Sequence, residues 1–114
     1  MPRGGLFNAC GGTSLEGLGA VLKECVALLT NESGAMHAAW ALGVPSVVIA
    51  GPSDPALTAP WGEAATILEK PEVWCVPCVR NDCPRWGNGH KECLARIGVD
   101  EVWEVLRERI EVRI

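Results

Sequence analysis

The sequence predicts an α/β protein with a parallel sheet, and three features of the chain lead to that fold class. Short apolar runs suited to buried parallel strands alternate with segments of helical periodicity. Two of these runs lead into polar or glycine- and proline-rich loops, at 31–34 and 51–62, and ligand loops of such sheets lie at the carboxyl ends of the strands. With 114 residues, 48% of them hydrophobic, the chain is long enough for one domain with a buried core.

A helix followed directly by a strand is predicted near the start of the chain. Thr13-Ser14-Leu15-Glu16 is a capping-box pattern, in which we expect the Thr13 hydroxyl to accept a hydrogen bond from the amide of residue 16. Leucines and Cys25 then recur at helical spacing. The apolar run 26–30 comes next and predicts a short buried strand.

A second helix and two further strands follow. Ser33 is a good N-cap for a helix that ends at Gly43. One face of this helix carries apolar side chains, namely Met36, Ala39 and Trp40. Residues 46–50 and 65–68 are predicted strands, separated by the loop 51–55, where glycine and proline predict that no regular structure forms.

The remaining part of the chain is predicted to be a cysteine-rich loop and a closing helix. Residues 71–98 hold four cysteines and several prolines, so we expect mostly loop there. Residues 99–114 predict an amphipathic helix with charges opposite an apolar stripe. The stripe consists of Val99, Val102, Trp103, Leu106 and Ile110.

Charge and hydropathy exclude several function classes. The net charge is −4 and the basic residues are scattered among acids, which argues against a nucleic-acid-binding surface. The first residues lack the apolar stretch of a signal peptide, and no apolar run approaches the roughly 20 residues of a membrane span. We therefore expect a cytoplasmic protein.

The turn between the first strand and the second helix has the chemistry of a phosphate site. The opening amides of a helix have no partners within it and carry the positive end of its dipole. Gly34 lets a ligand approach the backbone, Ser33 adds a hydroxyl, and His37 lies one turn inside the helix. The carboxylate of Glu32 does not suit phosphate but could accept hydrogen bonds from sugar hydroxyls. Together these groups fit a nucleotide-sugar.

The same residues also have a plainer interpretation, which spacing alone favours. Most helix starts with Ser-Gly bind nothing, and a single histidine inside a helix is more often a surface or boundary residue. The loop 51–55 is likewise more often a stiff turn than a site, and Trp61 is more often a packing residue.

Four of the six cysteines crowd into one short stretch of the chain, at Cys75, Cys78, Cys83 and Cys93. Their thiolates could hold a structural Zn²⁺ ion in tetrahedral geometry, with His90 as a spare ligand. Reduced loop thiols and disulfides are the two alternatives, and we favour zinc slightly over either.

The order of the motifs resembles one family, the ADP-heptose:lipopolysaccharide heptosyltransferases of glycosyltransferase family 9. Five motifs carry the resemblance in sequence order: Gly11-Gly12-Thr13-Ser14-Leu15, Thr30-Asn31-Glu32-Ser33-Gly34-Ala35-Met36-His37, Ala41-Leu42-Gly43-Val44-Pro45, Gly51-Pro52-Ser53-Asp54-Pro55 and Pro60-Trp61-Gly62. The resemblance runs from about Leu6 to the final helix. The cysteine cluster with Gly89-His90 also resembles a C-terminal variant found in many family members.

Such a resemblance implies a GT-B glycosyltransferase, with two Rossmann-like domains facing a cleft and the donor held by the C-terminal one. Residues 1–70 would then be a Rossmann-like donor-binding segment, 71–98 a cysteine-rich loop and 99–114 a C-terminal helix. The resemblance implies transfer to a lipopolysaccharide core sugar or a related glycan, with no cofactor or divalent cation needed for catalysis. The acceptors also imply a place at the inner face of the cytoplasmic membrane.

Site residues carried over by position define the donor site. The resemblance implies that Ser33, Gly34 and His37 hold the diphosphate of ADP-heptose or a similar nucleotide-sugar, and that Glu32 faces the sugar. The backbone near Thr13 would lie against the adenine. No catalytic residue is carried over, because the resemblance places the acceptor site and the general base in an N-terminal Rossmann domain that these residues do not contain.

Three positions depart from the family pattern. The family usually has Asp at Glu32, Lys at Gly12 and Pro at Ala35. The longer Glu32 side chain shifts the carboxylate and bears on the choice of sugar, and Gly12 removes a cation near the first helix. We expect the chain alone to have no transferase activity.

Two other functions stay open at this point. One is a non-catalytic α/β module whose zinc-binding cysteine loop and exposed half-sheet dock a partner. The other is a GT-B enzyme that uses a different nucleotide. Titration with ADP and ADP-sugars separates the donor-binding function from the docking module.

Overall fold

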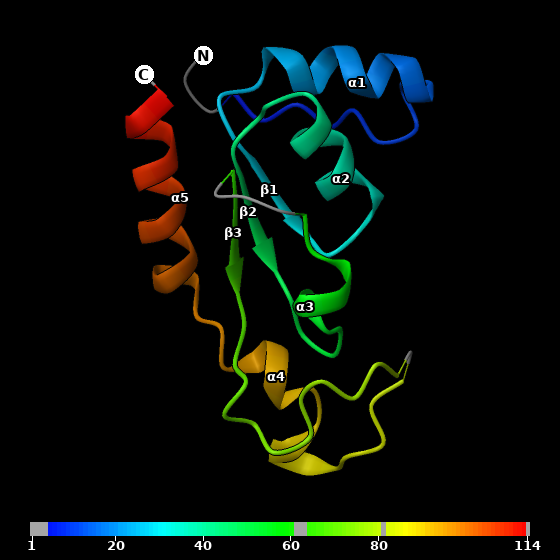
Figure 1. The fold of residues 1–114 in the computed structure, drawn as a ribbon, viewed down its shortest axis with the longest axis vertical. Coiled ribbons are helices and arrows are strands. Elements are labelled where there is room, and N and C mark those ends of the chain that lie inside the picture. The colour runs from blue at the N-terminus through cyan, green and yellow to red at the C-terminus, as the bar shows by residue number, and fades with distance from the viewer. Residues whose placement is uncertain (1–4, 61–63, 81, 114) are drawn as a thin grey trace.

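A small parallel sheet organises the chain, as the sequence predicts. The computed structural model describes residues 5–60, 64–80 and 82–113, and within them three strands pair in the order β1-β2-β3. The strands are β1 (Leu28–Asn31), β2 (Ser46–Ile49) and β3 (Ala65–Leu68), and both pairings are parallel. All strands run in the same direction down the molecule in Figure 1. The α/β class and the predicted third strand are both confirmed.

The central strand forms the centre of the core. Val47 and Val48 are both 0% exposed, because β2 has a neighbour on each edge and covering layers on its faces. Such two-sided burial explains why this strand reads as an unbroken apolar run rather than an alternating one. The one buried polar residue of the strand, Ser46, has no hydrogen-bond partner for its hydroxyl among the described residues.

Helices cover the two faces of the sheet. Helix α2 (Gly34–Ala41) packs against β1 and β2 on one face, and α1 (Leu15–Glu24) packs against α2. Helix α5 (Val99–Arg113) packs against β2 from the other face. Figure 1 shows α1 and α2 on one side of the strands and α5 on the other. This three-layer order is the one that a doubly covered parallel sheet requires.

The start of α1 differs in detail from the prediction. Ser14, not Thr13, is the N-cap, and its hydroxyl accepts a hydrogen bond from the Gly17 amide at 3.1 Å. Of the predicted stripe, Leu22 is buried, whereas Leu15 is 80% exposed. The helix therefore packs through its second half.

Helix α2 matches its prediction closely. Ser33 is the N-cap residue, and Met36 and Ala39 are buried against the sheet, whereas Trp40 is half exposed. Gly43 ends the helix with φ +73°, a left-handed conformation that favours glycine.

The loop after β2 contains one helical turn that the sequence did not predict. Helix α3 (Pro55–Thr58) begins inside the motif expected to be irregular. Asp54 caps it by accepting a hydrogen bond from the Ala56 amide at 3.1 Å, and proline suits the first position of a helix. Trp61, together with Gly62 of the family motif, lies outside the described residues.

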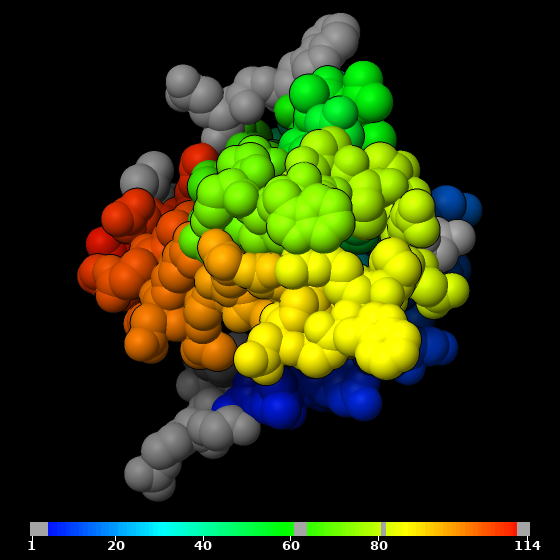
Figure 2. All heavy atoms as spheres, turned by 90° about the horizontal axis from the view of Figure 1, so that it is seen from below, coloured from blue at the N-terminus to red at the C-terminus, as the bar shows by residue number. Residues whose placement is uncertain are grey.

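The cysteine-rich segment lies at the end of the molecule where the strands finish (Figure 1). It is mostly loop, as predicted, with a 3-10 turn η1 (Gly87–Gly89) and one short helix, α4 (Glu92–Ala95). Figure 2 looks at this end directly and shows residues coloured yellow-green to orange spread across it. The Val79 amide donates to the Pro52 carbonyl at 2.7 Å, which joins the segment to the loop after β2.

Helix α5 is fixed to the third strand by polar contacts and leaves an apolar groove beside the first two strands. Lys70, just after β3, pairs with Glu101 at 3.0 Å, and Arg109 Nε donates to the Thr66 hydroxyl at 2.8 Å. A groove of about 370 Å³ lies between the helix and the sheet, lined by Leu29, Ile49, Ile97, Val99, Val102, Trp103 and Leu106. The predicted apolar stripe is thus partly covered, because Trp103 is still 52% exposed. Among the described residues, no helix has both the length and the apolar character to cross a membrane.

Replacing Gly51 by alanine should destabilise the chain, because Gly51 is buried and an added Cβ would lie 2.6 Å from a side-chain carbon of Leu94. Overpacking of this kind costs about 1–3 kcal/mol of unfolding free energy. Urea unfolding measures the loss, and Gly98→Ala is the matched control because nothing lies within 4 Å of its added Cβ.

Replacing Leu94 by alanine should remove most of the destabilisation that Gly51→Ala causes. In a Leu94→Ala background, Gly51→Ala is expected to cost much less than it does alone, which a double-mutant cycle measures as coupling between the two sites. Equal costs in both backgrounds would contradict the packing of α4 on this loop.

Candidate functional site

The turn between β1 and α2 presents helix amides that no side chain caps. Ser33 is extended, with φ −160° and ψ 179°, and its hydroxyl makes no cap hydrogen bond. That hydroxyl instead lies 3.3 Å from the hydroxyl of Thr30. Among the described residues, the amides of Gly34 and Ala35 have no acceptor. These two donors are the chemical feature from which an anion site could be built.

Gly34 lies in open surroundings among the described residues. It is exposed, and a Cβ built on it would meet nothing within 4 Å there. His37, one turn further along α2, is also exposed. The structure therefore brings three of the predicted residues, Ser33, Gly34 and His37, to one uncovered helix start.

A carboxylate lies beside this helix start and connects it to the next loop. The Ser53 hydroxyl donates to Glu32 Oε2 at 2.7 Å, a contact that is partly buried. Glu32 follows β1 and Ser53 follows β2, so neighbouring strands supply the two partners. Ser53 was not among the predicted site residues. Its position at the carboxyl end of the adjacent strand was the signal that could have indicated it.

Thr13 is the predicted site residue with no polar contact to this turn. It precedes Ser14, the N-cap of α1, and among the described residues no hydrogen bond joins it to Glu32, Ser33, Gly34 or His37. The candidate site consequently consists of Glu32, Ser33, Gly34 and His37, with Ser53 from the neighbouring loop.

A hollow lies within the cysteine-rich segment. It has a volume of about 450 Å³, and Pro52 forms part of its wall. Its lining includes all four predicted zinc ligands, Cys75, Cys78, Cys83 and Cys93. This hollow therefore borders the same loop that supplies Ser53.

The family of the chain follows from comparison with known proteins. The model of glycosyltransferase family 9 (heptosyltransferase) matches residues 3–87. The chain belongs to glycosyltransferase family 9. This match covers both loops of the candidate site and confirms the resemblance read from the ordered motifs.

Curated relatives of this family 9 chain are named as heptosyltransferases. A lipooligosaccharide heptosyltransferase 2 from Campylobacter jejuni is 28% identical over 101 residues, covering 89% of this chain and 31% of the relative. One from Haemophilus influenzae is 38% identical over 101 residues, 89% of this chain and 28% of the relative. A lipopolysaccharide heptosyltransferase 2 from Salmonella typhimurium is 41% identical over 61 residues, 54% of this chain and 18% of the relative. The chain thus spans under a third of the length of these relatives, and no solved structure matches it.

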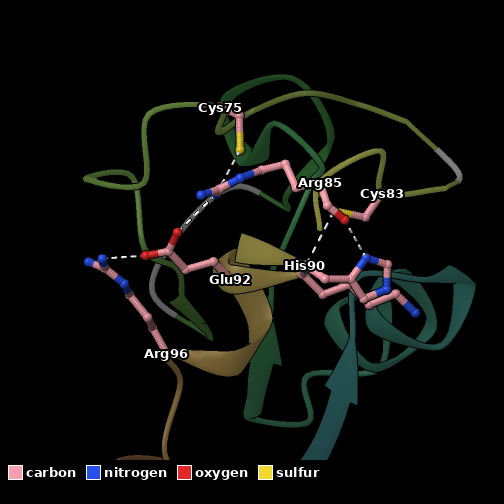
Figure 3. A network of polar contacts seen from close by, with 7 residues as sticks. Cys75, Cys83, Arg85, His90, Glu92 and Arg96 are labelled. Atoms are coloured by element: carbon pink, nitrogen blue, oxygen red, sulfur yellow. Dashed lines mark hydrogen bonds and ion pairs between the residues drawn. The ribbon is translucent and has the colours of Figure 1, made fainter. Parts of the chain in front are cut away.

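An arginine lies among the thiols of this family 9 chain, which the sequence analysis missed. Arg85 Nη1 donates to Cys75 Sγ at 3.6 Å and pairs with Glu92 at 2.9 Å (Figure 3). Its guanidinium also lies over the Trp74 ring, 5.2 Å from the centroid. Arg96 pairs with the same Glu92 carboxylate from the following turn. The hydrogen bond from Arg85 lowers the pKa of Glu92 below its usual range.

The four thiols lie in different surroundings within the hollow. The backbone amide of Lys91 donates to Cys83 Sγ at 3.2 Å and, with that of Arg85, lowers the pKa of Cys83. Burial raises the pKa of Cys93, and the nearby thiols of the other three cysteines raise it further. All six cysteines of the chain are free.

The predicted zinc site gains no support from this arrangement. Within the described ranges, which include all four cysteines, no group of three or more His, Cys, Asp or Glu side chains is placed to hold a metal ion. His90, the predicted spare ligand, has its Nδ1 3.0 Å from the carbonyl oxygen of Arg85. The Arg85 cation contacts Cys75, one of the four thiols predicted to bind the ion. Cysteine spacing predicted that the thiols line one hollow but not that an arginine contacts one of them.

Glu92→Gln should lower the unfolding free energy at neutral pH, because it removes the charge that pairs with Arg85 and Arg96. The lowered pKa of Glu92 means that its contribution is complete above the ordinary carboxyl pKa of about 4.3 and is lost as the pH falls through the lowered value. Urea unfolding should show a constant gap between wild type and variant from about pH 7 to about pH 5, closing towards about pH 3.

Glu108→Gln is the control for this series, since Glu108 is exposed on α5 and has no ion pair among the described residues. It should show little difference at any pH. A gap for Glu92→Gln that persists unchanged at the acid end would contradict an ionic link.

Proposed function

We propose that this chain is the donor-binding part of a family 9 glycosyltransferase and binds ADP-heptose or a similar nucleotide-sugar. The observation that carries the proposal is the pair of uncapped amides, Gly34 and Ala35, that open α2 directly after a parallel strand. The relatives named as heptosyltransferases support a nucleotide-sugar as the ligand. Family membership supports a specific ligand at this otherwise common kind of helix start.

In the proposed complex, the diphosphate lies against the start of α2. The amides of Gly34 and Ala35 donate to phosphate oxygens, where the positive end of the helix dipole also favours negative charge. The Ser33 hydroxyl and the exposed ring of His37 add side-chain donors. The same groups stabilise the charge that develops on the leaving diphosphate during transfer, and this role needs no divalent cation.

Glu32 is proposed to face the sugar. An ionised carboxylate only accepts hydrogen bonds, so it repels phosphate and suits sugar hydroxyls. Its Oε2 is bonded by Ser53, whereas Oε1 has no partner among the residues that the structure describes. One oxygen is thus available to the donor sugar while the other is held.

Titration of the chain with ADP tests the diphosphate site. We expect His37→Ala to weaken ADP binding by about tenfold or more, since a hydrogen bond to a charged group contributes about 1.5–3 kcal/mol. Isothermal calorimetry measures this change. His90→Ala, at the chain's only other histidine, is the matched control and should bind ADP as wild type does.

Two results would contradict the site. Equal losses from His37→Ala and His90→Ala would indicate a general structural effect. A complete lack of ADP binding by the wild-type chain would favour a non-catalytic module that docks a partner, the alternative left open by the sequence.

Transfer itself is proposed to need a second Rossmann-like domain. The chain matches under a third of the length of relatives named as heptosyltransferases, which supports a further domain in the active enzyme. We therefore propose that a lipopolysaccharide core sugar or a related glycan is held by the other domain, at the inner face of the cytoplasmic membrane. The assembled protein would have the GT-B arrangement.

The chain alone should give no heptosyl transfer. Incubation with ADP-heptose and a core-glycan acceptor is expected to yield no product above a blank without protein, and mass spectrometry of the acceptor measures this. Clear product would overturn the proposal that transfer needs a second domain. Binding of ADP in the same preparation is the control that the donor site is folded.

A further inference from the structure

The Glu32 side chain is held by a residue from the neighbouring loop. Ser53 Oγ lies 2.7 Å from Glu32 Oε2, and the two residues are 21 positions apart in the chain. Parallel pairing of β1 with β2 brings them together, since both follow the carboxyl ends of adjacent strands. The contact is thus a consequence of the fold and joins the two loops at the sheet edge.

Ser53 is itself fixed by the residues on either side of it. The carbonyl of Pro52 accepts a hydrogen bond from the Val79 amide at 2.7 Å. On the other side, the Asp54 carboxylate caps α3 by accepting from the Ala56 amide at 3.1 Å. A serine between two anchored neighbours presents its hydroxyl in a defined direction.

The cysteine-rich segment supplies part of this support. Val79 belongs to that segment, and Leu94 of α4 packs so closely on Gly51 that a Cβ there would lie 2.6 Å away. The segment therefore holds the loop after β2 from its far side. The cysteine-rich segment therefore supports the loop that carries Ser53, and this support does not depend on a bound metal ion.

A glutamate in this position needs such an anchor more than an aspartate does. Its additional methylene adds a rotatable bond, and fixing each side-chain torsion costs conformational entropy. A hydrogen bond to one carboxylate oxygen restricts the side chain before any ligand arrives. Preorganisation of this kind improves recognition because less freedom is lost on binding.

We propose that Ser53 is a positioning residue for sugar recognition. It holds the Glu32 carboxylate so that Oε1 faces the sugar hydroxyls of the donor, and the loop that carries it is braced by the cysteine-rich segment. The inference rests on the donor-binding function proposed above. It adds a residue from the second loop that acts on the sugar and not on the nucleotide.

Separate titrations of the full chain with ADP and ADP-heptose test this role. Wild type should bind ADP-heptose more tightly than ADP. Ser53→Ala should leave the ADP affinity within about twofold and lower the ADP-heptose affinity by about five- to tenfold, the effect expected for one lost hydrogen bond. Ser53→Thr retains a hydroxyl and should restore the preference for ADP-heptose.

A second variant, Ser53→Cys, tests the same role in case Ser53→Ala does not fold. Ser53→Cys keeps a similar shape with only a weak donor, so it should lose the same preference as Ser53→Ala. Melting temperatures of all variants are compared with wild type before the titrations.

The outcomes separate this proposal from the donor-binding function. If wild type binds ADP but shows no preference for ADP-heptose, the sugar-positioning role is overturned while nucleotide binding stands. An equal loss for both ligands in Ser53→Ala, or no loss for either, also overturns it. If wild type binds neither ligand, the donor-binding function fails and this proposal fails with it.

Discussion

In the parallel register of the sheet, Asn31 lies opposite Ile49, so the loops that follow these residues leave the sheet at the same level and the same edge. Glu32 and the start of α2 are neighbours in the chain, whereas Ser53 reaches them only through this pairing. It brings Ser53 from the next loop within hydrogen-bond distance of the Glu32 carboxylate. A one-residue slip of β2 would turn its buried side chains to the opposite face and carry Ser53 away.

That pairing is maintained from both sides of the sheet. Buried valines of β2 and side chains of α2 cover one another in the core, and α5 covers the opposite face. At the carboxyl end, the cysteine-rich segment adds a third support through Val79 and Leu94. The cysteine-rich segment, which is mostly irregular, thus contributes to the rigidity of the loop after β2.

The polar network explains how a mostly irregular segment keeps its shape. Arg85 connects the Cys75 thiol with the Glu92 carboxylate, 17 positions further along the chain (Figure 3). Its guanidinium also lies over the ring of Trp74, the residue before Cys75. Because Glu92 also pairs with Arg96, the network extends into the short helix α4. Such links replace the regular hydrogen bonding that the loop lacks. They also bring a positive charge against Cys75, one of the four predicted zinc ligands.

Local sequence patterns predicted the sheet and most helices because the interactions that form strands, helices and caps depend on residues that are close in the chain. The strand at Ala65–Leu68 and the end of α2 at Gly43 follow from an apolar run and from a left-handed glycine. The cap of α1 was predicted one residue early, since Thr13 and Ser14 both carry a hydroxyl and differ only in register. The structure selects Ser14, whose hydroxyl reaches the Gly17 amide.

Contacts between distant segments were not predictable in the same way. The partnership of Glu32 with Ser53 depends on strand order, which no local pattern contains. The position of Arg85 among the cysteines depends on how an irregular loop folds back on itself. Cysteine spacing gives only the number of thiols brought together and not what lies between them. Long-range packing decided both cases.

The candidate site offers unpaired polar groups from one turn and its neighbouring loop. Its donors, the amides of Gly34 and Ala35, and its acceptor, Glu32 Oε1, lack partners within the described residues. A nucleotide-sugar resting there would satisfy these groups on one side only, with its other side exposed to water. Water weakens each charged contact compared with a closed site. Under the proposed function, moderate donor affinity without transfer is therefore expected of the chain alone, and closure by a second domain is expected to strengthen binding and permit reaction together.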